Sequence, residues 1–242
     1  MKTLFYKIDA WFKKYFFNPK WRCIACGKEI FEGEFCEQCK EELPFNDKVI
    51  CEHCGRKIIA PQNYCSTCKG VLVSLDKCRS VFNYAPPISS LIKKMKYDNA
   101  RYLAEIFSSY LAVVYFKNYM NVDCVTFVPM TKKSEKRRGY NQSKLLAEFT
   151  AKRINLPVLE CLVKVKETNR QAKLTRKERL INLTDAFKVV DKKNVKEKSV
   201  LIIDDVSTTG ATAEAIANKL KKVGAKCVML LSLASVSPSD KY

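Results

Sequence analysis

The sequence predicts an α/β protein: a parallel sheet flanked by helices, with a small cysteine-rich module before it. From residue 76 onwards, short apolar runs of strand length are followed by stretches with apolar residues at helical spacing. Strands joined through helices are typical of parallel sheets covered on their faces. Before residue 70, eight of the twelve cysteines fall in four C-x-x-C pairs, a spacing typical of zinc sites.

The length of 242 residues is enough for one substantial domain and a small one. We expect a helix over 1–22, a double zinc ribbon over 23–70 and the α/β domain over 71–242. The hydrophobic share of 47% excludes a globally disordered chain. No apolar run approaches the roughly 18–20 residues of a membrane span, and charges within the first 14 residues argue against a signal peptide.

The formal charge of +19 comes from 44 Lys and Arg against 25 Asp and Glu. A strongly basic surface favours polyanions such as nucleic acid, anionic lipid or phosphorylated small molecules. Lysine-rich surfaces also occur in proteins that bind none of these, so the charge alone leaves nucleic-acid binding open.

The first 22 residues carry an apolar stripe at helical spacing, with lysines on the other side and Pro19 at the end. Such a basic amphipathic helix can lie on a membrane surface as a peripheral contact, or pack against protein. We favour packing, because Asp9 and the short length give little membrane affinity.

Four thiolates in tetrahedral geometry suit zinc, so the four pairs predict two structural zinc ions. Sequential quartets are the simplest arrangement, although a cross-braced pairing stays open. Four tandem pairs argue against a redox role, and His53 is expected outside the metal sites. Without a secretion signal, the pattern indicates a reducing, cytoplasmic location. The predicted ligands are Cys23, Cys26, Cys36, Cys39, Cys51, Cys54, Cys65 and Cys68.

The remaining elements follow from apolar periodicity. Strands are expected over 79–85, 122–128, 158–163, 187–190, 200–203 and 225–233, and helices over 88–96, 99–119 and 143–154. The polar segment 164–182 is expected to be a long loop that is either functional or disordered, and over a phosphate site it could be a lid. Isolated cysteines in apolar strand contexts are expected to be free and buried; they are Cys78, Cys124, Cys161 and Cys227.

A basic loop follows the strand that ends at Pro129. It reads TKKSEKRRGYNQS, contains Arg137 and Arg138, and precedes the helix expected over 143–154. The order of strand, basic loop and helix is typical of anion binding and would suit a pyrophosphate. A solvated charge run is the alternative here. It is also the interpretation we favour for Lys93, Lys94 and Lys96, although these lysines could meet an anion.

The stretch over 200–224 organises the chain. A buried strand is followed by Asp204 and Asp205, by a loop of small residues and hydroxyls, and by a helix that ends near Gly224. Helix N-termini bind phosphate, and acids at the carboxyl end of a strand can accept hydrogen bonds from sugar hydroxyls. The pattern predicts a pocket for a ribose 5-phosphate group. The loop residues are Ser207, Thr208, Thr209, Gly210, Ala211 and Thr212.

The segment IIDDVSTTGAT resembles the phosphoribosyl pyrophosphate (PRPP) signature of type I phosphoribosyltransferases. From about residue 23 to 236, the chain resembles the ComF family, also called ComFC, which pairs a double zinc ribbon with a phosphoribosyltransferase-like domain. Besides that signature, the resemblance includes the four cysteine pairs, LIKKMKYDNARYLA, the five residues from Arg138 to Gln142, Thr168-x-x-Gln171 and Arg176-x-x-Arg179-x-x-Asn182.

The resemblance implies roles for the predicted site. Asp204 and Asp205 would take the catalytic positions and bind the ribose hydroxyls, and residues 208–212 would bind the 5′-phosphate. Arg137, Arg138 and the backbone after Pro129 would face pyrophosphate, together with Mg²⁺. An active enzyme would displace pyrophosphate from the anomeric carbon of the ribose, chiefly by stabilising charge.

The resemblance also implies a role in DNA uptake during natural transformation, in which the protein handles single-stranded DNA at the inner face of the membrane. Other DNA-uptake proteins would then be partners. A metabolic phosphoribosyltransferase of nucleotide salvage, with a structural zinc module, is the alternative. A zinc-ribbon nucleic-acid binder with a degenerate enzyme fold is a third possibility.

Overall fold

The computed structural model describes residues 22–46, 50–55, 58, 64, 65, 68, 74–167, 183, 185–208 and 210–236. The chain divides into two compact units, residues 1–43 and residues 44–242. The first cysteine quartet belongs to the first unit, whereas the second quartet belongs to the same unit as the sheet. The domain boundaries given above stay predictions, and the helix expected over 1–22 lies outside the described residues except for Arg22.

Four parallel strands form the main sheet in the order β1-β6-β5-β2. The apolar runs predict them because strands covered on both faces need side chains that are apolar in both directions. In β5, for example, four consecutive residues from Val200 to Ile203 are fully buried. The strands are β1 (Lys77–Asn83), β2 (Cys124–Phe127), β5 (Ser199–Ser207) and β6 (Cys227–Ser235).

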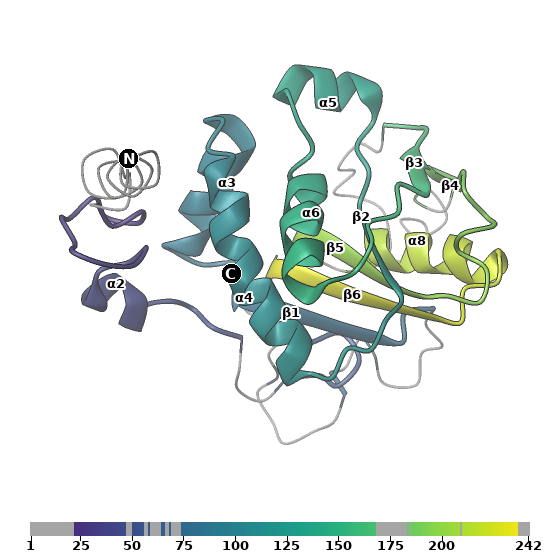
Figure 1. The fold of residues 1–242 in the computed structure, drawn as a ribbon, viewed down its shortest axis with the longest axis horizontal. Helices are drawn as coiled ribbons and strands as arrows, with labels where there is room; N and C mark the ends of the chain where they lie inside the picture. The colour runs from purple at the N-terminus through teal and green to yellow at the C-terminus, as the bar shows by residue number, and fades with distance from the viewer. Residues whose placement is uncertain are drawn as a thin grey trace, which may run out of the picture. The chain divides into compact units, whose positions relative to one another are not determined.

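Helices cover both faces of this sheet, with α4 and α6 on one face and α8 on the other (Figure 1). On the α8 side, Val200 and Ile202 of β5 pack in one core with Ile216 and Leu220 of α8. This alternation across the strand fixes the sheet between two layers. The helices are α3 (Ile88–Tyr97), α4 (Tyr102–Lys117), α6 (Gln142–Ile154) and α8 (Ala211–Lys222). The predicted fold class is confirmed.

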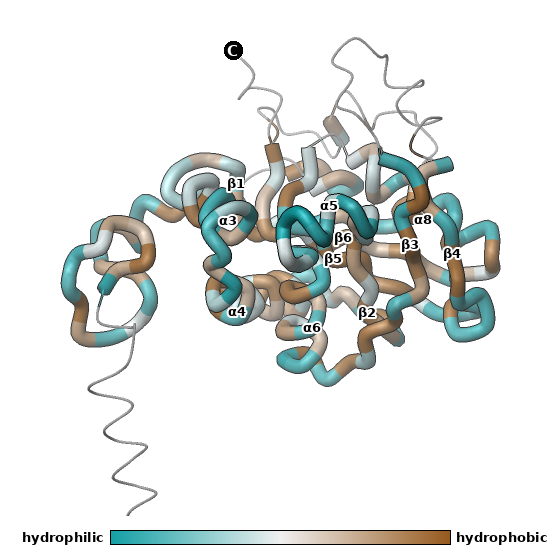
Figure 2. Tube along the Cα trace, turned by 90° about the horizontal axis from the view of Figure 1, so that it is seen from above, coloured by the Kyte–Doolittle hydropathy of each residue, from teal (hydrophilic) through white to brown (hydrophobic). Residues whose placement is uncertain are grey.

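The basic loop predicted after β2 is instead a short helix, α5 (Lys132–Arg138). Thr131 caps it by accepting a hydrogen bond from the Ser134 backbone N–H at 3.2 Å, and Gly139 ends it in the left-handed conformation. None of its side chains is buried, and Figure 2 shows it as hydrophilic. Because no apolar stripe marks this helix, periodicity alone did not predict it.

Three strand predictions differ from the structure. The strand expected over 158–163 begins later, as β3 (Leu162–Lys164), and pairs antiparallel with β4 (Phe187–Val189) in a separate two-stranded sheet. In addition, β5 continues past residue 203 through both aspartates, because β6 pairs with it as far as Ser207. Of the loop expected over 164–182, residues 168–182 lie outside the described residues.

Two further features concern helices and thiols. A five-residue helix that the sequence did not predict, α2 (Glu37–Glu41), follows Cys36. In the described ranges, no helix is long and apolar enough to cross a membrane. The isolated cysteines are free as expected, and all are buried except Cys227, which is half-buried.

Candidate functional site

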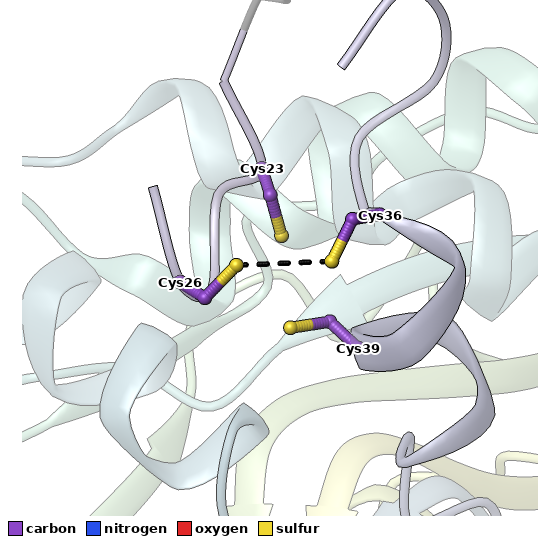
Figure 3. Close-up of side chains that lie close together, drawn as sticks. All are labelled: Cys23, Cys26, Cys36 and Cys39. Carbon is purple, nitrogen blue, oxygen red and sulfur yellow. Dashed lines mark hydrogen bonds between the residues drawn. The ribbon is translucent and has the colours of Figure 1, made fainter. Parts of the chain in front are cut away.

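The eight paired cysteines form two separate clusters of four sulfurs. In the first unit, the sulfurs of the first quartet converge (Figure 3), and Cys26 Sγ lies 3.7 Å from Cys36 Sγ. In the second unit, Cys54 Sγ and Cys65 Sγ are also 3.7 Å apart. A tetrahedral zinc–thiolate site, with Zn–S bonds of about 2.3 Å, places its sulfurs about 3.8 Å apart. The geometry fits two zinc ions in sequential quartets, and His53 is not part of either cluster.

The thiol chemistry agrees with this fit. Burial raises the pKa of the Cys23 thiol, but the backbone N–H groups of Cys26, Cys36 and Ala25 outweigh burial and lower that pKa to about 6. Burial and the neighbouring thiols raise the pKa of Cys39 well above its ordinary value. Four thiolates held this close repel one another, and a bound divalent cation would remove that repulsion.

The second cluster is joined to the edge strand β1. The Cys78 N–H donates to the His53 carbonyl at 2.8 Å, and the Asn46 side chain donates to the Gly55 carbonyl at 2.6 Å. The same amide contacts Ser80 Oγ at 2.7 Å. Gly55 lies so close to β1 that an added Cβ would be 2.5 Å from the Cys78 carbonyl oxygen. This cluster is therefore built onto the sheet.

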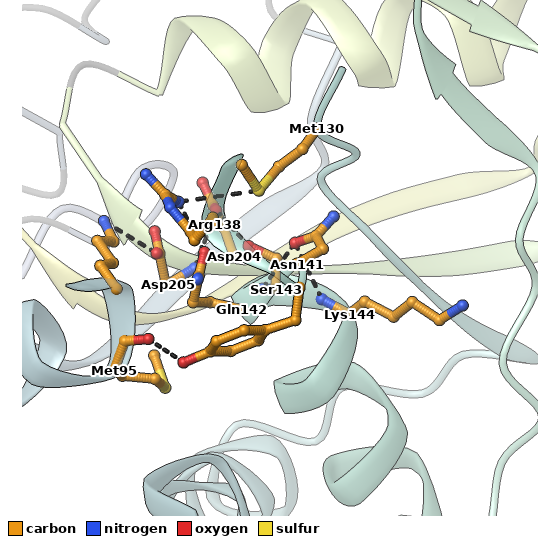
Figure 4. A network of polar contacts seen from close by, with 11 residues as sticks. Met95, Met130, Arg138, Asn141, Gln142, Ser143, Lys144, Asp204 and Asp205 are labelled. Atoms are coloured by element: carbon orange, nitrogen blue, oxygen red, sulfur yellow. Dashed lines mark hydrogen bonds and ion pairs between the residues drawn. The ribbon is translucent and has the colours of Figure 1, made fainter. Parts of the chain in front are cut away.

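Asp204 and Asp205 lie within the last residues of β5, where side chains of two helices contact them (Figure 4). Ser143 of α6 donates its hydroxyl to Asp204 Oδ1 at 3.0 Å. The same oxygen accepts the backbone N–H of Asp205 at 2.9 Å. Asp205 Oδ2 forms an ion pair with Lys96 Nζ of α3 at 2.9 Å. Lys96, predicted on a solvated face, is instead half-buried in the site.

The electrostatics distinguish the two acids. Burial, and then the charge of Asp205, raise the pKa of Asp204 to about 7, while Lys96 and the Ser143 hydroxyl oppose the shift. Burial lowers the pKa of the Lys164 ammonium in β3, and the charges of Glu167 and Asp204 oppose that shift. At neutral pH the Asp204 carboxyl is therefore protonated in a substantial fraction of molecules, so it can donate as well as accept hydrogen bonds.

The start of α8 lies next along the chain. Ser207 ends β5, Thr208 is exposed, and Thr209 lies outside the described residues. Gly210 is the N-cap in the left-handed conformation, with φ of 74°, and nothing lies within 4 Å of where its Cβ would be. Ala211 and Thr212 form the first turn. A helix N-terminus whose cap has no side chain leaves room for an anion to approach the first-turn N–H groups.

The junction of α5 and α6 supplies the basic side of the site. Arg138 donates to Gln142 Oε1 at 2.7 Å and lies 3.8 Å from the Met130 sulfur, whereas Arg137 is exposed. Asn141 caps α6 and donates to the Val128 carbonyl at 3.1 Å, which fixes the backbone beside the buried Pro129. The structure thus brings Arg138 toward the site through Gln142.

Two buried polar atoms near the acids lack partners among the described residues. Gln142 is 1% exposed and its Nε2 amide finds no acceptor, and Ser232 Oγ, on the residue paired with Asp204, is likewise unpaired. Buried polar groups are nearly always hydrogen-bonded, so such atoms at a cluster of charged residues favour a ligand.

Sequence reasoning missed three residues of this site: Lys96, Gln142 and Ser143. Each belongs to a stretch quoted for the family resemblance or borders one. Their roles depend on contacts between segments far apart in the chain, such as Ser143 with Asp204. Helical periodicity predicts which face of its own helix a residue occupies, but it does not predict which residue of another element that side chain contacts.

Comparison with known proteins places this geometry in a family. Residues 14–69 match the double zinc ribbon domain, and residues 141–241 match the phosphoribosyl transferase domain. Competence protein F of Haemophilus influenzae is 33% identical over 230 residues, which cover 90% of this chain and 98% of that protein. The chain belongs to the ComF family.

Other relatives match over similar lengths. DNA utilization protein YhgH of Escherichia coli K12 is 28% identical over 219 residues, covering 87% of this chain and 95% of that one. Competence protein ComFC of Bacillus subtilis is 26% identical over 216 residues, covering 84% of each chain. These matches confirm the resemblance drawn from the sequence, and the two clusters of four cysteines agree with the matched zinc ribbon.

Proposed function

We propose that this ComF protein binds PRPP or a related ribose phosphate and acts in DNA uptake by handling single-stranded DNA. The observation that carries the proposal is the placement of Asp204 and Asp205 at the end of β5, between the N-terminus of α8 and the junction of α5 with α6. The names of its relatives, competence and DNA utilization proteins, support the DNA part.

In this proposal, the ribose hydroxyls bond to the two carboxyls and the 5′-phosphate lies at the start of α8. The pyrophosphate lies toward Arg138 and the Nε2 amide of Gln142, an orphaned donor that matches an anionic oxygen. Mg²⁺ favours phosphate oxygens and retained waters over dedicated protein cages, so it would arrive with the pyrophosphate.

A transfer reaction at this site would break the bond between the anomeric carbon and the pyrophosphate oxygen and form one to an acceptor. The bonding pair leaves with pyrophosphate, and the acceptor loses a proton. Arg138 would stabilise the leaving charge, and the acids would stabilise the cationic sugar. No protein nucleophile is needed.

Calorimetric titration of the zinc-loaded protein with PRPP and Mg²⁺ tests the ligand. Changing Asp204 and Asp205 to Ala should weaken binding by at least about 100-fold, because both carboxyl partners of the sugar are removed. Asp185→Ala, at an exposed acid before β4, should bind like the wild type. Unchanged affinity in the double variant would refute the pocket. Steady pyrophosphate release on adding a base would instead favour a salvage enzyme.

The exposed lysines of α5 supply a surface for single-stranded DNA. Changing Lys132, Lys133 and Lys136 to Glu should weaken binding and lower the magnitude of the slope of log K against log salt by about 2, because each lost phosphate contact removes about 0.7. The matched control replaces exposed Lys192, Lys193 and Lys198. Equal slopes in both triple variants, measured by fluorescence anisotropy, would exclude α5 from the DNA surface.

A further inference from the structure

Lys96 departs from the pattern of its own helix. Its neighbours Lys93 and Lys94 are exposed, whereas the Lys96 side chain is 20% exposed and its ammonium lies 2.9 Å from Asp205 Oδ2. The Asp205 side chain is itself only 13% exposed. Burying an ammonium is costly unless a partner compensates, and the Asp205 carboxylate is that partner here.

Two adjacent carboxylates are otherwise a typical donor set for a divalent cation. Here one oxygen of each carboxylate already has a partner. Lys96 occupies Asp205 Oδ2, and Asp204 Oδ1 accepts from Ser143 and from the Asp205 backbone N–H. A dication at these two oxygens would have to displace their donors, and anywhere on the pair it would be repelled by the ammonium.

A second lysine also offsets the negative charge of Asp204 and Asp205. Lys164 of β3 interacts electrostatically with Glu167 and with Asp204, and the half-buried Asp204 adjoins the buried Asp205. The two lysines, from α3 and β3, therefore offset the charge of the two aspartates of β5 and leave little net negative charge for an external cation. What remains are hydrogen-bonding oxygens and an ammonium, which suit a hydroxylated, phosphorylated sugar.

We propose that Lys96 takes the place of a divalent cation at the Asp204–Asp205 pair, so that a ribose phosphate binds the acids without a metal ion on the carboxylates. The identity of the ligand rests on the proposed function, but the replacement of a metal by Lys96 does not. Lys96 is then a positioning residue that keeps the pair charge-balanced.

Manganese binding to the zinc-loaded full chain tests the replacement directly. Mn²⁺ prefers oxygen ligands and competes poorly for the thiolate sites. Electron paramagnetic resonance should detect no Asp205-dependent Mn²⁺ site in the wild type. Lys96→Met should create such a site, with Mn²⁺ affinity at least about 10-fold higher than that of the wild type, because the repelling charge is gone. The double variant Lys96→Met with Asp205→Asn should lose it again.

Matched variants separate charge from packing. Lys96→Arg keeps the charge and should gain no site, and Lys94→Met alters an exposed lysine of the same helix and should behave like the wild type. Lys96→Gln provides the same readout if the methionine variant does not fold by circular dichroism. An Asp205-dependent Mn²⁺ site in the wild type, or a folded Lys96 variant without any gain, would overturn the proposal.

Ribose 5-phosphate, which lacks the pyrophosphate, tests the link to the ligand. Wild-type affinity should change less than about twofold when Mg²⁺ is added, whereas Lys96→Met should bind about 10-fold more weakly without Mg²⁺ and recover with it. An equal Mg²⁺ requirement in both proteins would overturn the proposal. If neither protein binds ribose 5-phosphate in either buffer, the PRPP titration decides the proposed function, and the manganese result still decides the role of Lys96.

Discussion

Asp204 is an acid whose surroundings favour its neutral form. Its pKa of about 7 follows from burial and from Asp205, and is limited by Lys96 and the Ser143 hydroxyl. Lys164 faces it from β3. Because the ordinary value is 3.8, the folded chain binds more protons here than the unfolded chain between about pH 4 and pH 7. The contribution of Asp204 to stability therefore falls as the pH rises through that range.

Asp204→Asn should remove the loss of stability that ionisation of Asp204 causes as the pH rises. We expect the variant to melt higher than the wild type at pH 8, by about 2–4 °C for a gain on the order of 1 kcal/mol. The difference should shrink toward pH 4.5, where the wild-type carboxyl is protonated. Differential scanning calorimetry across this range measures it, with Asp185→Asn as the control. A constant difference at every pH would show that the Asp204 pKa is not raised.

At the scale of secondary-structure elements, the main feature is the contact that holds the second cysteine cluster against β1. The loop carrying the cluster is held at one edge of the sheet by Asn46, by the His53 carbonyl and by Arg79, which donates to the Glu52 carbonyl at 2.8 Å. Gly55 is essential to this approach, since its φ is 67° and the space for a Cβ is filled by β1 backbone.

Gly55→Ala should therefore be far more destabilising than a glycine change without the clash. Gly210→Ala is the matched control, because φ is 74° there and nothing lies within 4 Å of the added Cβ. We expect the control to lose about 1–2 kcal/mol of unfolding free energy, from the left-handed conformation alone. Gly55→Ala should lose at least about 3 kcal/mol. Urea unfolding measures both. Equal losses would mean that the loop can move away from β1.

Sequence reasoning succeeded for the elements whose signals are local. The order of strand, acids and helix over 200–224 is present as predicted, and Gly224 has the positive φ expected just after a helix. It failed where strand pairing or tertiary packing determines the length, partner or environment of an element. The length of β5 depends on pairing with β6, β4 pairs outside the main sheet with β3, and Lys96 leaves its solvated face for a carboxylate on another element. The helix α5 had local signals in Thr131 and Gly139, but its charges suggested a loop.

At the scale of the whole molecule, the two cysteine clusters belong to different units. Metal at the second cluster should therefore stabilise the unit that contains the sheet, whereas metal at the first should stabilise residues 1–43. Structural zinc sites contribute folding free energy directly, since the unfolded chain lacks the preformed site.

Cys51→Ser should lower the melting temperature of the main unfolding transition by at least about 5 °C, and Cys23→Ser should leave that transition within about 2 °C of the wild type. Each variant should lose one of two zinc ions by metal analysis. Calorimetry of the zinc-loaded proteins measures the transitions. An equal loss in both variants would show that the units unfold together.

Tyr140 connects the two helices that serve the acidic pair. Its hydroxyl donates to the Met95 carbonyl, one residue before Lys96, and its ring lies 4.6 Å from the Arg101 guanidinium. Three residues further along is Ser143, the other partner of the pair. The positions of Lys96 and Ser143 are thus set while the chain folds, before any ligand arrives. Association then does not have to order these two side chains, which removes that part of its entropic cost and favours a rate limited by encounter.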